Sequence, residues 1–192
     1  MIIALTGNFG SGKSTAAKIF QEFGFKILDS DQLVKDIYAS DSSVLSEMTH
    51  YFGKDILTPQ GTLDKQLLAK RVFSNKESLH WLENLVHPKL VQLINHLISQ
   101  EPGSNWVVEI PILFEKNLAI DFDLTICLSA QVDLQLSRLI KKGVNLEDAK
   151  ARIAFQMPLS EKLKRADYII DNNSDIDSLR KQIRSLIKNL KL

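Results

Sequence analysis

Residues 7–14, Gly-Asn-Phe-Gly-Ser-Gly-Lys-Ser, are the stretch of this chain that decides its fold. They match the pattern G-x-x-x-x-G-K-[ST], which chance alone supplies in only about a few chains per thousand. Residues 2–6 before them form a continuous apolar run, typical of a strand buried on both faces. Apolar residues between positions 16 and 23 then follow helical spacing. The sequence therefore predicts a strand, a glycine-rich loop and a helix in direct succession.

A loop of this kind binds phosphate through its backbone. Its N–H groups and the positive end of the helix dipole converge on the anion, and the glycines let the backbone come close. We expect Lys13 to reach the β and γ phosphates of ATP, and the Ser14 hydroxyl to ligate Mg²⁺. The alternative is a glycine-rich turn with an incidental lysine. The residues expected to contact ATP are Gly7, Gly10, Ser11, Gly12, Lys13, Ser14 and Thr15.

Strands alternate with helices along the rest of the chain, apart from one long helical stretch. Short apolar runs predict further strands at 25–28, 106–110, 124–128 and 168–170. Residues 43–100 show only helical stripes, and Pro88 should bend or divide the last of these helices because it lacks an N–H. This order predicts an α/β fold with a mostly parallel five-stranded sheet flanked by helices.

Composition excludes several classes of protein. The 192 residues carry a net charge of only +1, so no overall field attracts nucleic acid or an anionic membrane, and any anion site must be local. No run approaches the roughly 20 apolar residues of a membrane helix. The single cysteine, Cys127, lies in an apolar run and reads as a buried thiol in a core strand. We expect a cytoplasmic protein that acts on small molecules.

The residues that accompany the loop separate the enzymes that share it. A GTPase needs Asp-x-x-Gly, and no Asp here has Gly three positions later. The one Asn-Lys pair, at 75–76, lies in the helical stretch, where it cannot form a guanine pocket. A motor ATPase would carry a longer chain and an apolar run ending in Asp-Glu. A short chain with a helical insertion and a basic segment favours a small-molecule kinase.

Two carboxylates follow the second predicted strand. Asp29 and Asp31 are two residues apart, so in extended chain they point to the same side, at the sheet edge where open α/β sheets bind ligands. Asp31 is the candidate for the base that deprotonates an attacking hydroxyl, with a possible share in holding Mg²⁺. The alternative is that these residues cap the next helix, because Asp29-x-x-Gln32 resembles a capping box.

Four further charged residues are candidates, each with a plainer alternative. Glu109 and Glu115 follow the strand at 106–110, where a carboxylate can accept from Mg²⁺-bound water, but either could be a surface charge. Arg138 and Lys142 are four apart on one predicted helix and so share a face. That face suits a lid that neutralises charge on a transferring phosphoryl group, and the alternative is a solvated helix face.

Motifs spread over nearly the whole chain resemble those of the dephospho-coenzyme A kinase family. They are Leu5-Thr6-Gly7 leading into Gly-Ser-Gly-Lys-Ser-Thr, Asp29-Ser30-Asp31, Gly61-Thr62-Leu63-Asp64, Val72-Phe73, His87-Pro88, Ile110-Pro111-Ile112-Leu113-Phe114-Glu115, Gln135 with Arg138, Gln156, and Ala166-Asp167 followed by Ile169-Ile170-Asp171-Asn172. The loop alone occurs in many families, whereas this ordered combination is specific to one.

The resemblance implies a P-loop kinase core, a helical coenzyme A domain and a lid. It implies that the γ-phosphoryl group of ATP passes to the 3′-hydroxyl of dephospho-coenzyme A, the final step of coenzyme A biosynthesis, with Mg²⁺. Asp31 would be the base, Arg138 the lid arginine near ATP, and Asn172 a residue near the adenine. The expected division of the single kinase chain 1–192 is a nucleotide-binding core at 1–40 and 104–192, a coenzyme A region at 41–103 and a lid at 131–165.

Three positions depart from the family pattern. Lys65 and Lys142 stand where the family often has Arg, and Gly143 replaces a common acidic neighbour. Lysine makes a point contact and lacks the bidentate fork of arginine. A function of another class also stays open, in which the loop is the switch of a nucleotide-dependent regulatory protein; Asp31 and the lid arginine argue against it.

Overall fold

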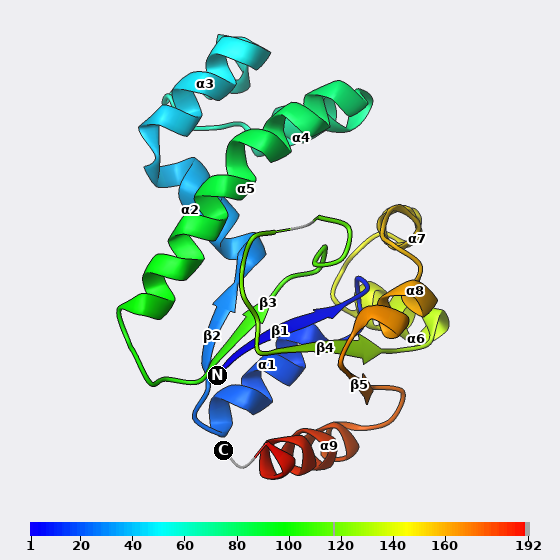
Figure 1. Cartoon of the computed structure of the whole chain (residues 1–192). Helices are drawn as coiled ribbons and strands as arrows, with labels where there is room; N and C mark the ends of the chain where they lie inside the picture. The colour runs from blue at the N-terminus through cyan, green and yellow to red at the C-terminus, as the bar shows by residue number, and fades with distance from the viewer. Residues whose placement is uncertain (117, 191–192) are drawn as a thin grey trace. The chain divides into compact units, whose positions relative to one another are not determined.

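The structure, a computed structural model, describes residues 1–116 and 118–190. The chain folds into two compact units (Figure 1). The core unit consists of Met1–Asp29 and Glu101–Leu192, and the helical unit of Ser30–Gln100.

A five-stranded sheet forms the centre of the core unit (Figure 1). The strands are β1 (Ile2–Gly7), β2 (Lys26–Asp29), β3 (Trp106–Glu109), β4 (Leu124–Ser129) and β5 (Tyr168–Asp171). Their order is β2-β3-β1-β4-β5, and each pairing between these described strands is parallel. The predicted α/β fold and its five strands are confirmed. Because the strands run the same way, their carboxyl ends meet at one edge of the sheet.

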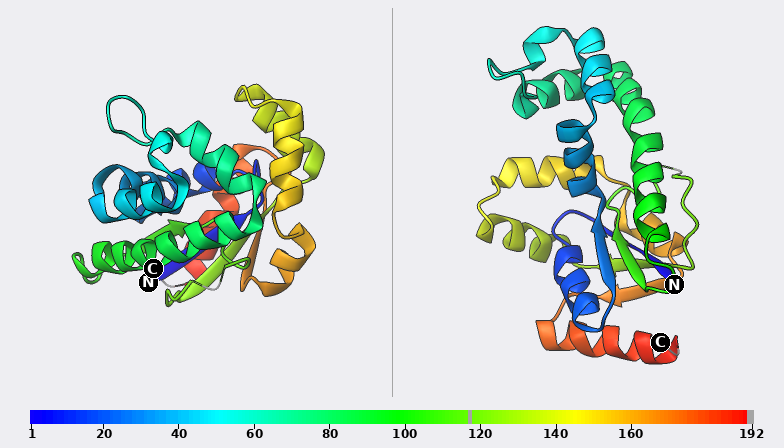
Figure 2. Two further views of the ribbon diagram at one scale, coloured as in Figure 1. Left: turned by 90° about the horizontal axis from the view of Figure 1, so that it is seen from above. Right: turned by 90° about the vertical axis from the view of Figure 1, so that its left-hand side faces the viewer.

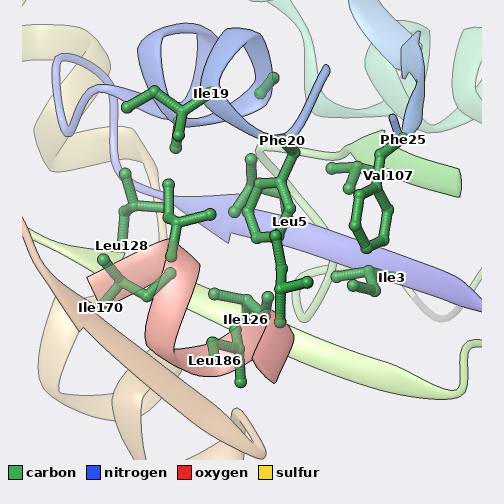
Figure 3. Packing of buried hydrophobic residues seen from close by; sticks show 14 of the residues in the cluster. Ile3, Leu5, Ile19, Phe20, Phe25, Val107, Ile126, Leu128, Ile170 and Leu186 are labelled. Carbon is green, nitrogen blue, oxygen red and sulfur yellow. The ribbon is translucent and has the colours of Figure 1, made fainter. Parts of the chain in front are cut away.

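The core unit's helices cover this sheet. They are α1 (Lys13–Glu22), α6 (Val132–Lys141), α7 (Leu146–Phe155), α8 (Leu159–Arg165) and α9 (Ile176–Asn189). The main core lies where α1 and α9 pack together on one face, and Figure 3 shows Phe20 and Leu186 of these helices in one cluster with Leu5 and Ile126 of the sheet. Burying each such side chain stabilises the fold by about 1.5–3 kcal/mol. Cys127, next to Ile126 on β4, is a free, buried thiol, as predicted.

The helical unit contains no long strand in its described residues, as its sequence predicts. Its elements are α2 (Ser30–Ser40), α3 (Ser42–Phe52), the short 3₁₀ helix η1 (Lys54–Ile56), α4 (Lys65–Ser74) and α5 (Lys76–Ser99). Helix α5 runs alongside α2 (Figure 2). No helix in the described part of either unit is long and apolar enough to cross a membrane.

Helix α5 passes through its proline without a break, so of the two outcomes expected at Pro88, a bend or a division, the division does not occur. A proline inside a helix costs about 3 kcal/mol. The buried residues Leu82, Val86, Leu90 and Ile94 recur every four positions on both sides of it. Burial of these four side chains, at about 1.5–3 kcal/mol each, outweighs that cost and keeps one apolar stripe continuous.

The boundary between the units also differs from the one expected. The sequence placed residues 30–40 with the nucleotide-binding core, but the helical unit begins at Ser30. The reason is packing, because α2 contacts both α3 and α5. Within the same unit, Lys89 of α5 donates to Asp41, the residue that caps α3, over 2.9 Å.

Candidate active site

Residues 7–14, here called the phosphate loop, connect the carboxyl end of β1 to α1. Gly7 and Gly12 have φ angles of 143° and 98°, which side chains disfavour. A Cβ on Gly12 would lie 2.2 Å from Nδ2 of Asn172, and a Cβ on Gly7 would lie 2.8 Å from the Leu128 carbonyl oxygen. Both positions therefore require glycine, for conformation and for space.

The start of α1 offers positive charge to this loop. The helix has no acidic residue in its first turn and no side-chain cap at Gly12. Lys13 folds back on the loop, where its Nζ donates to the carbonyl oxygens of Gly7 and Asn8 over 2.8 and 3.3 Å. A helix N-terminus with an adjacent ammonium group favours an anion.

A hydroxyl and a carboxylate meet beside the loop. Ser14 Oγ donates to Glu109 Oε2 over 3.2 Å, and Glu109 is only 7% exposed. Glu109 ends β3 and is paired in register with Asp29 at the end of β2. Hydroxyl and carboxylate oxygens are ligands that Mg²⁺ prefers, usually alongside several waters. The chemistry of these donors therefore fits a magnesium site at Ser14.

Glu115 forms an ion pair with Lys162 of α8. Its Oε1 lies 2.8 Å from the ammonium nitrogen of Lys162 and accepts from the Met157 backbone N–H over 2.9 Å. The Glu115 side chain is 16% exposed and that of Lys162 is 0% exposed. The alternative of a surface charge is therefore wrong, because this carboxylate is largely enclosed and paired with a lysine. Its acceptance of a hydrogen bond from Mg²⁺-bound water stays a prediction. Nothing in its local sequence indicates a partner 47 residues away.

Arg138 and Asn172 come together at the phosphate loop. Asn172 Nδ2 donates to the Ser11 carbonyl over 2.7 Å, and Arg138 donates to the carbonyls of Asn172 and Ser11 over 2.9 and 3.5 Å. Burial lowers the pKa of the Arg138 guanidinium from its usual value, but an arginine stays protonated in proteins. A permanent cation therefore lies against the loop, and the reading of Arg138 as part of a solvated face is wrong.

Lys142 does not join Arg138. Helix α6 ends at Lys141, and Lys142 is an exposed cap residue with backbone no longer helical. The four-residue spacing predicts a shared face only while the helix continues, and here it stops first.

Asp31 lies in the helical unit. It is an exposed residue in the first turn of α2, two residues along the chain from Asp29. Its role as the base stays a prediction.

One contact of the loop was not predicted from spacing. The Phe9 backbone N–H donates to Gln156 Oε1 over 2.7 Å, and the Arg152 guanidinium carbon lies 5.3 Å from the centroid of the Phe9 ring. Both partners belong to α7 or the residue that ends it. Gln156 was singled out only through the family motif, and no role was predicted for Arg152.

A parallel sheet with a phosphate loop after its central strand is the architecture of the P-loop kinases, and this chain has that fold. The sequence model of the family described as dephospho-CoA kinase matches residues 1–178. The chain belongs to the dephospho-CoA kinase family.

Individual relatives agree over nearly the full length. The chain is 39% identical to the dephospho-CoA kinase of Carboxydothermus hydrogenoformans over 194 residues, covering 99% of this chain and 94% of that protein. The crystal structure of TT1252 from Thermus thermophilus superposes with a TM-score of 0.86 at 31% identity, covering 99% of this chain and 97% of that one. Dephospho-CoA kinase from Campylobacter jejuni gives a TM-score of 0.69 at 28% identity, covering 98% and 96%.

Proposed function

We propose that this chain transfers the γ-phosphoryl group of ATP to the 3′-hydroxyl of dephospho-coenzyme A, giving coenzyme A and ADP. The observation that carries the proposal is the phosphate loop, in which Lys13 lies against the loop carbonyls and Ser14 contacts the buried Glu109. Membership of the dephospho-CoA kinase family supports dephospho-coenzyme A as the acceptor.

In the proposed step the 3′-oxygen of the acceptor attacks the γ-phosphorus. A bond forms between them as the bond from that phosphorus to the β,γ-bridging oxygen breaks, and the bridging oxygen leaves on ADP. Lys13 and the loop N–H groups stabilise the charge that spreads over the transferring group. Arg138, already in contact with Ser11, adds a second cation at the same loop. Asn172, bonded to the same carbonyl, would lie near the adenine.

Asp31 is the group we assign to the proton of the attacking hydroxyl. Its carboxylate takes that proton as the new bond to phosphorus forms, and the kinases that use an Asp in this way support the assignment. Asp31 follows Asp29, the last residue of β2, by two positions along the chain. Strand β2 pairs with β3, the strand that ends in Glu109.

Ser14 and Glu109 are the residues that would hold Mg²⁺. The ion, when bound, would neutralise charge on the phosphates, with the Ser14 hydroxyl as a ligand and Glu109 as a partner of the ion or its waters. Asp31 would share in this site. Glu109 keeps the Ser14 hydroxyl oriented through their hydrogen bond, and both residues belong to the core unit.

The remaining assignments concern regions and surroundings. We assign nucleotide binding to the core unit, the coenzyme A portion of the acceptor to the helical unit, and the lid to residues 131–165. The partners are small molecules rather than nucleic acid or membrane, which the net charge of +1 supports. The proposed cytoplasmic location is supported by the free thiol of Cys127.

A competition between acceptors tests the proposal. The chain is incubated with ATP, Mg²⁺ and equal amounts of dephospho-coenzyme A, adenosine and shikimate, and the phosphorylated products are identified by mass spectrometry. We expect coenzyme A as the only phosphorylated product, with one ADP released per coenzyme A. Release of ADP without any phosphorylated acceptor would instead indicate a nucleotide switch, and phosphorylated shikimate would show a different kinase.

A further inference from the structure

The junction between α7 and α8, residues 156–158, is bonded to two other parts of the core unit. On one side Gln156 Oε1 accepts from the Phe9 N–H of the phosphate loop over 2.7 Å. On the other side the Met157 N–H donates to Glu115 Oε1 over 2.9 Å. Two consecutive residues therefore connect the phosphate loop with the segment that follows β3.

Phe9 is the loop residue that makes the bond to Gln156. It lies in a glycine-rich segment, and glycine backbones lose the most conformational freedom when they become ordered. The loop has one internal turn bond nearby, from the Ser11 N–H to the Asn8 carbonyl over 3.0 Å. Gln156 adds an acceptor from outside the loop, and Arg152 covers the Phe9 ring. Both the backbone and the side chain of Phe9 are thus held from the α7 side.

A buried ion pair holds the junction itself. Lys162 is fully buried, with its Nζ 2.8 Å from Glu115 Oε1 and 2.6 Å from the Pro111 carbonyl oxygen. The same carbonyl accepts from the hydroxyl of Thr6, the residue before the phosphate loop, over 3.4 Å. Lys162 cannot leave this position without its buried charge losing its partner, and only 16% of the Glu115 side chain is exposed. Glu115 is therefore a rigid acceptor for the Met157 N–H.

We propose that Gln156 is a positioning residue for the phosphate loop, and that the Glu115–Lys162 pair acts through it by holding the junction in place. The loop is then ordered before ATP arrives, and binding does not have to supply that ordering. The inference rests on the proposed function in taking ATP as the ligand of the loop, but it does not depend on the acceptor.

The first experiment replaces Gln156 by Met, which has a similar length but only a weak acceptor. We expect Gln156→Met to weaken ATP binding by about 3- to 10-fold, the usual effect of losing one hydrogen bond. We also expect the Phe9 amide to exchange its hydrogen faster in ¹⁵N NMR, with the melting temperature unchanged. ATP affinity is measured by calorimetry with ATP and Mg²⁺ alone.

The matched control changes an ion pair on α8 that faces solvent. Glu161 and Lys164 lie 2.8 Å apart with 46% and 70% of their side chains exposed. Glu161→Gln should leave ATP affinity and Phe9 exchange at parental values. An unchanged ATP affinity in Gln156→Met would overturn the proposal. So would a weaker affinity accompanied by a lower melting temperature and unchanged Phe9 exchange, because that combination describes a general loss of structure.

A double-mutant cycle tests the role of the ion pair. Lys162→Met should also weaken ATP binding, and adding Gln156→Met should weaken it no further if the pair acts through Gln156. Additive losses would overturn that part of the proposal. Where Lys162→Met does not fold, Glu115→Gln replaces it, because glutamine keeps the size and an acceptor for the Met157 N–H.

The outcomes separate this inference from the proposed function. A parent chain that binds ATP but does not phosphorylate dephospho-coenzyme A would contradict the proposed acceptor, and the calorimetric comparison of Gln156 variants would stand. A parent chain that binds no ATP would contradict both.

Discussion

Two lysine–carboxylate pairs, one in each unit, lie in different surroundings. In the helical unit Lys89 and Asp41 are 2.9 Å apart, with 32% and 31% of their side chains exposed. In the core unit Lys162 and Glu115 are 2.8 Å apart, with 0% and 16% exposed. The distances are nearly equal, but water and salt screen the first pair more than the second. The Lys89–Asp41 pair and the other exposed charges should therefore tolerate replacement, whereas the Lys162–Glu115 pair should not.

The charge of Lys13 gives the strongest test of this difference. Lys13→Ala should lower turnover by about 10³-fold or more, because it removes the ammonium that stabilises the transferring phosphoryl group. The fold should stay intact, which circular dichroism and the melting temperature would check. Turnover within about tenfold of the parent, at saturating ATP and Mg²⁺, would show that the phosphate loop is not the catalytic phosphate site.

Asp31 should be the exception in the helical unit. Asp31→Asn keeps the size and one acceptor oxygen but cannot take a proton, so kcat should fall by roughly 10²- to 10⁴-fold while ATP still binds. Asn and Asp cap helices about equally well, so a capping role predicts almost no change. Asp36→Asn, on an exposed position of the same helix, is the control. Near-parental kcat in Asp31→Asn would reject the base assignment and direct attention to Asp29.

The ion pairs themselves can be compared directly through stability. Lys162→Met should lower the free energy of unfolding by up to about 3–5 kcal/mol, because it leaves the largely enclosed carboxylate of Glu115 without its partner. Lys89→Met should have a much smaller effect, because water can solvate Asp41. Urea unfolding of both variants measures the difference. Equal losses would mean that burial does not distinguish the two pairs.

Within the core unit, contact with the loop should matter more than charge alone. Arg138→Ala should lower turnover by about tenfold or more and raise the ATP requirement, because Arg138 contacts Ser11 and Asn172. Lys141 is exposed at the end of the same helix, so Lys141→Ala should change little. Steady-state kinetics with varied ATP compare the two, and similar small effects from both would leave Arg138 as one more surface charge.

Acid should produce the smallest of these effects, in the helical unit. Hydrogen bonds from the Ser43 hydroxyl and Lys89 hold the pKa of Asp41 below its usual 3.8. The resulting stabilisation is present above pH 3.8 and is lost as the pH falls further, toward the folded pKa. Asp41→Asn still caps α3 but cannot titrate, so the parent should melt higher at neutral pH and this advantage should shrink in acid. A constant difference across the titration would contradict the assignment.

Local pattern predicted the parts of this molecule that depend on neighbours in sequence. The phosphate loop with Lys13 and Ser14, and the strands around it, were predicted because glycine spacing and apolar runs report backbone shape directly. The contact of Ser14 with Glu109 was half-predicted, since parallel strands bring their ends to one edge.

Pairings across long sequence separations could not be predicted in the same way. The pairing of Glu115 with Lys162 was not predicted, because burial of a lysine follows from the packing of α8 and not from the residues beside it. The shared face predicted for Arg138 and Lys142 also depended on something the local sequence does not show, namely the length of α6, which ends at Lys141. Pro88 does not divide α5, because tertiary packing outweighs its local cost.

The labelling rate of the single thiol, Cys127, can measure how often the core opens. Burial raises the pKa of Cys127 to about 11, and a protonated, enclosed sulfur does not react with alkylating reagents. Cys127 lies on β4, which is paired with β1 on one side and β5 on the other. Its rate of labelling therefore reports how often the centre of the sheet separates, without any engineered probe. If ATP binds to the phosphate loop, saturating nucleotide should slow that rate, because the ligand stabilises the closed form.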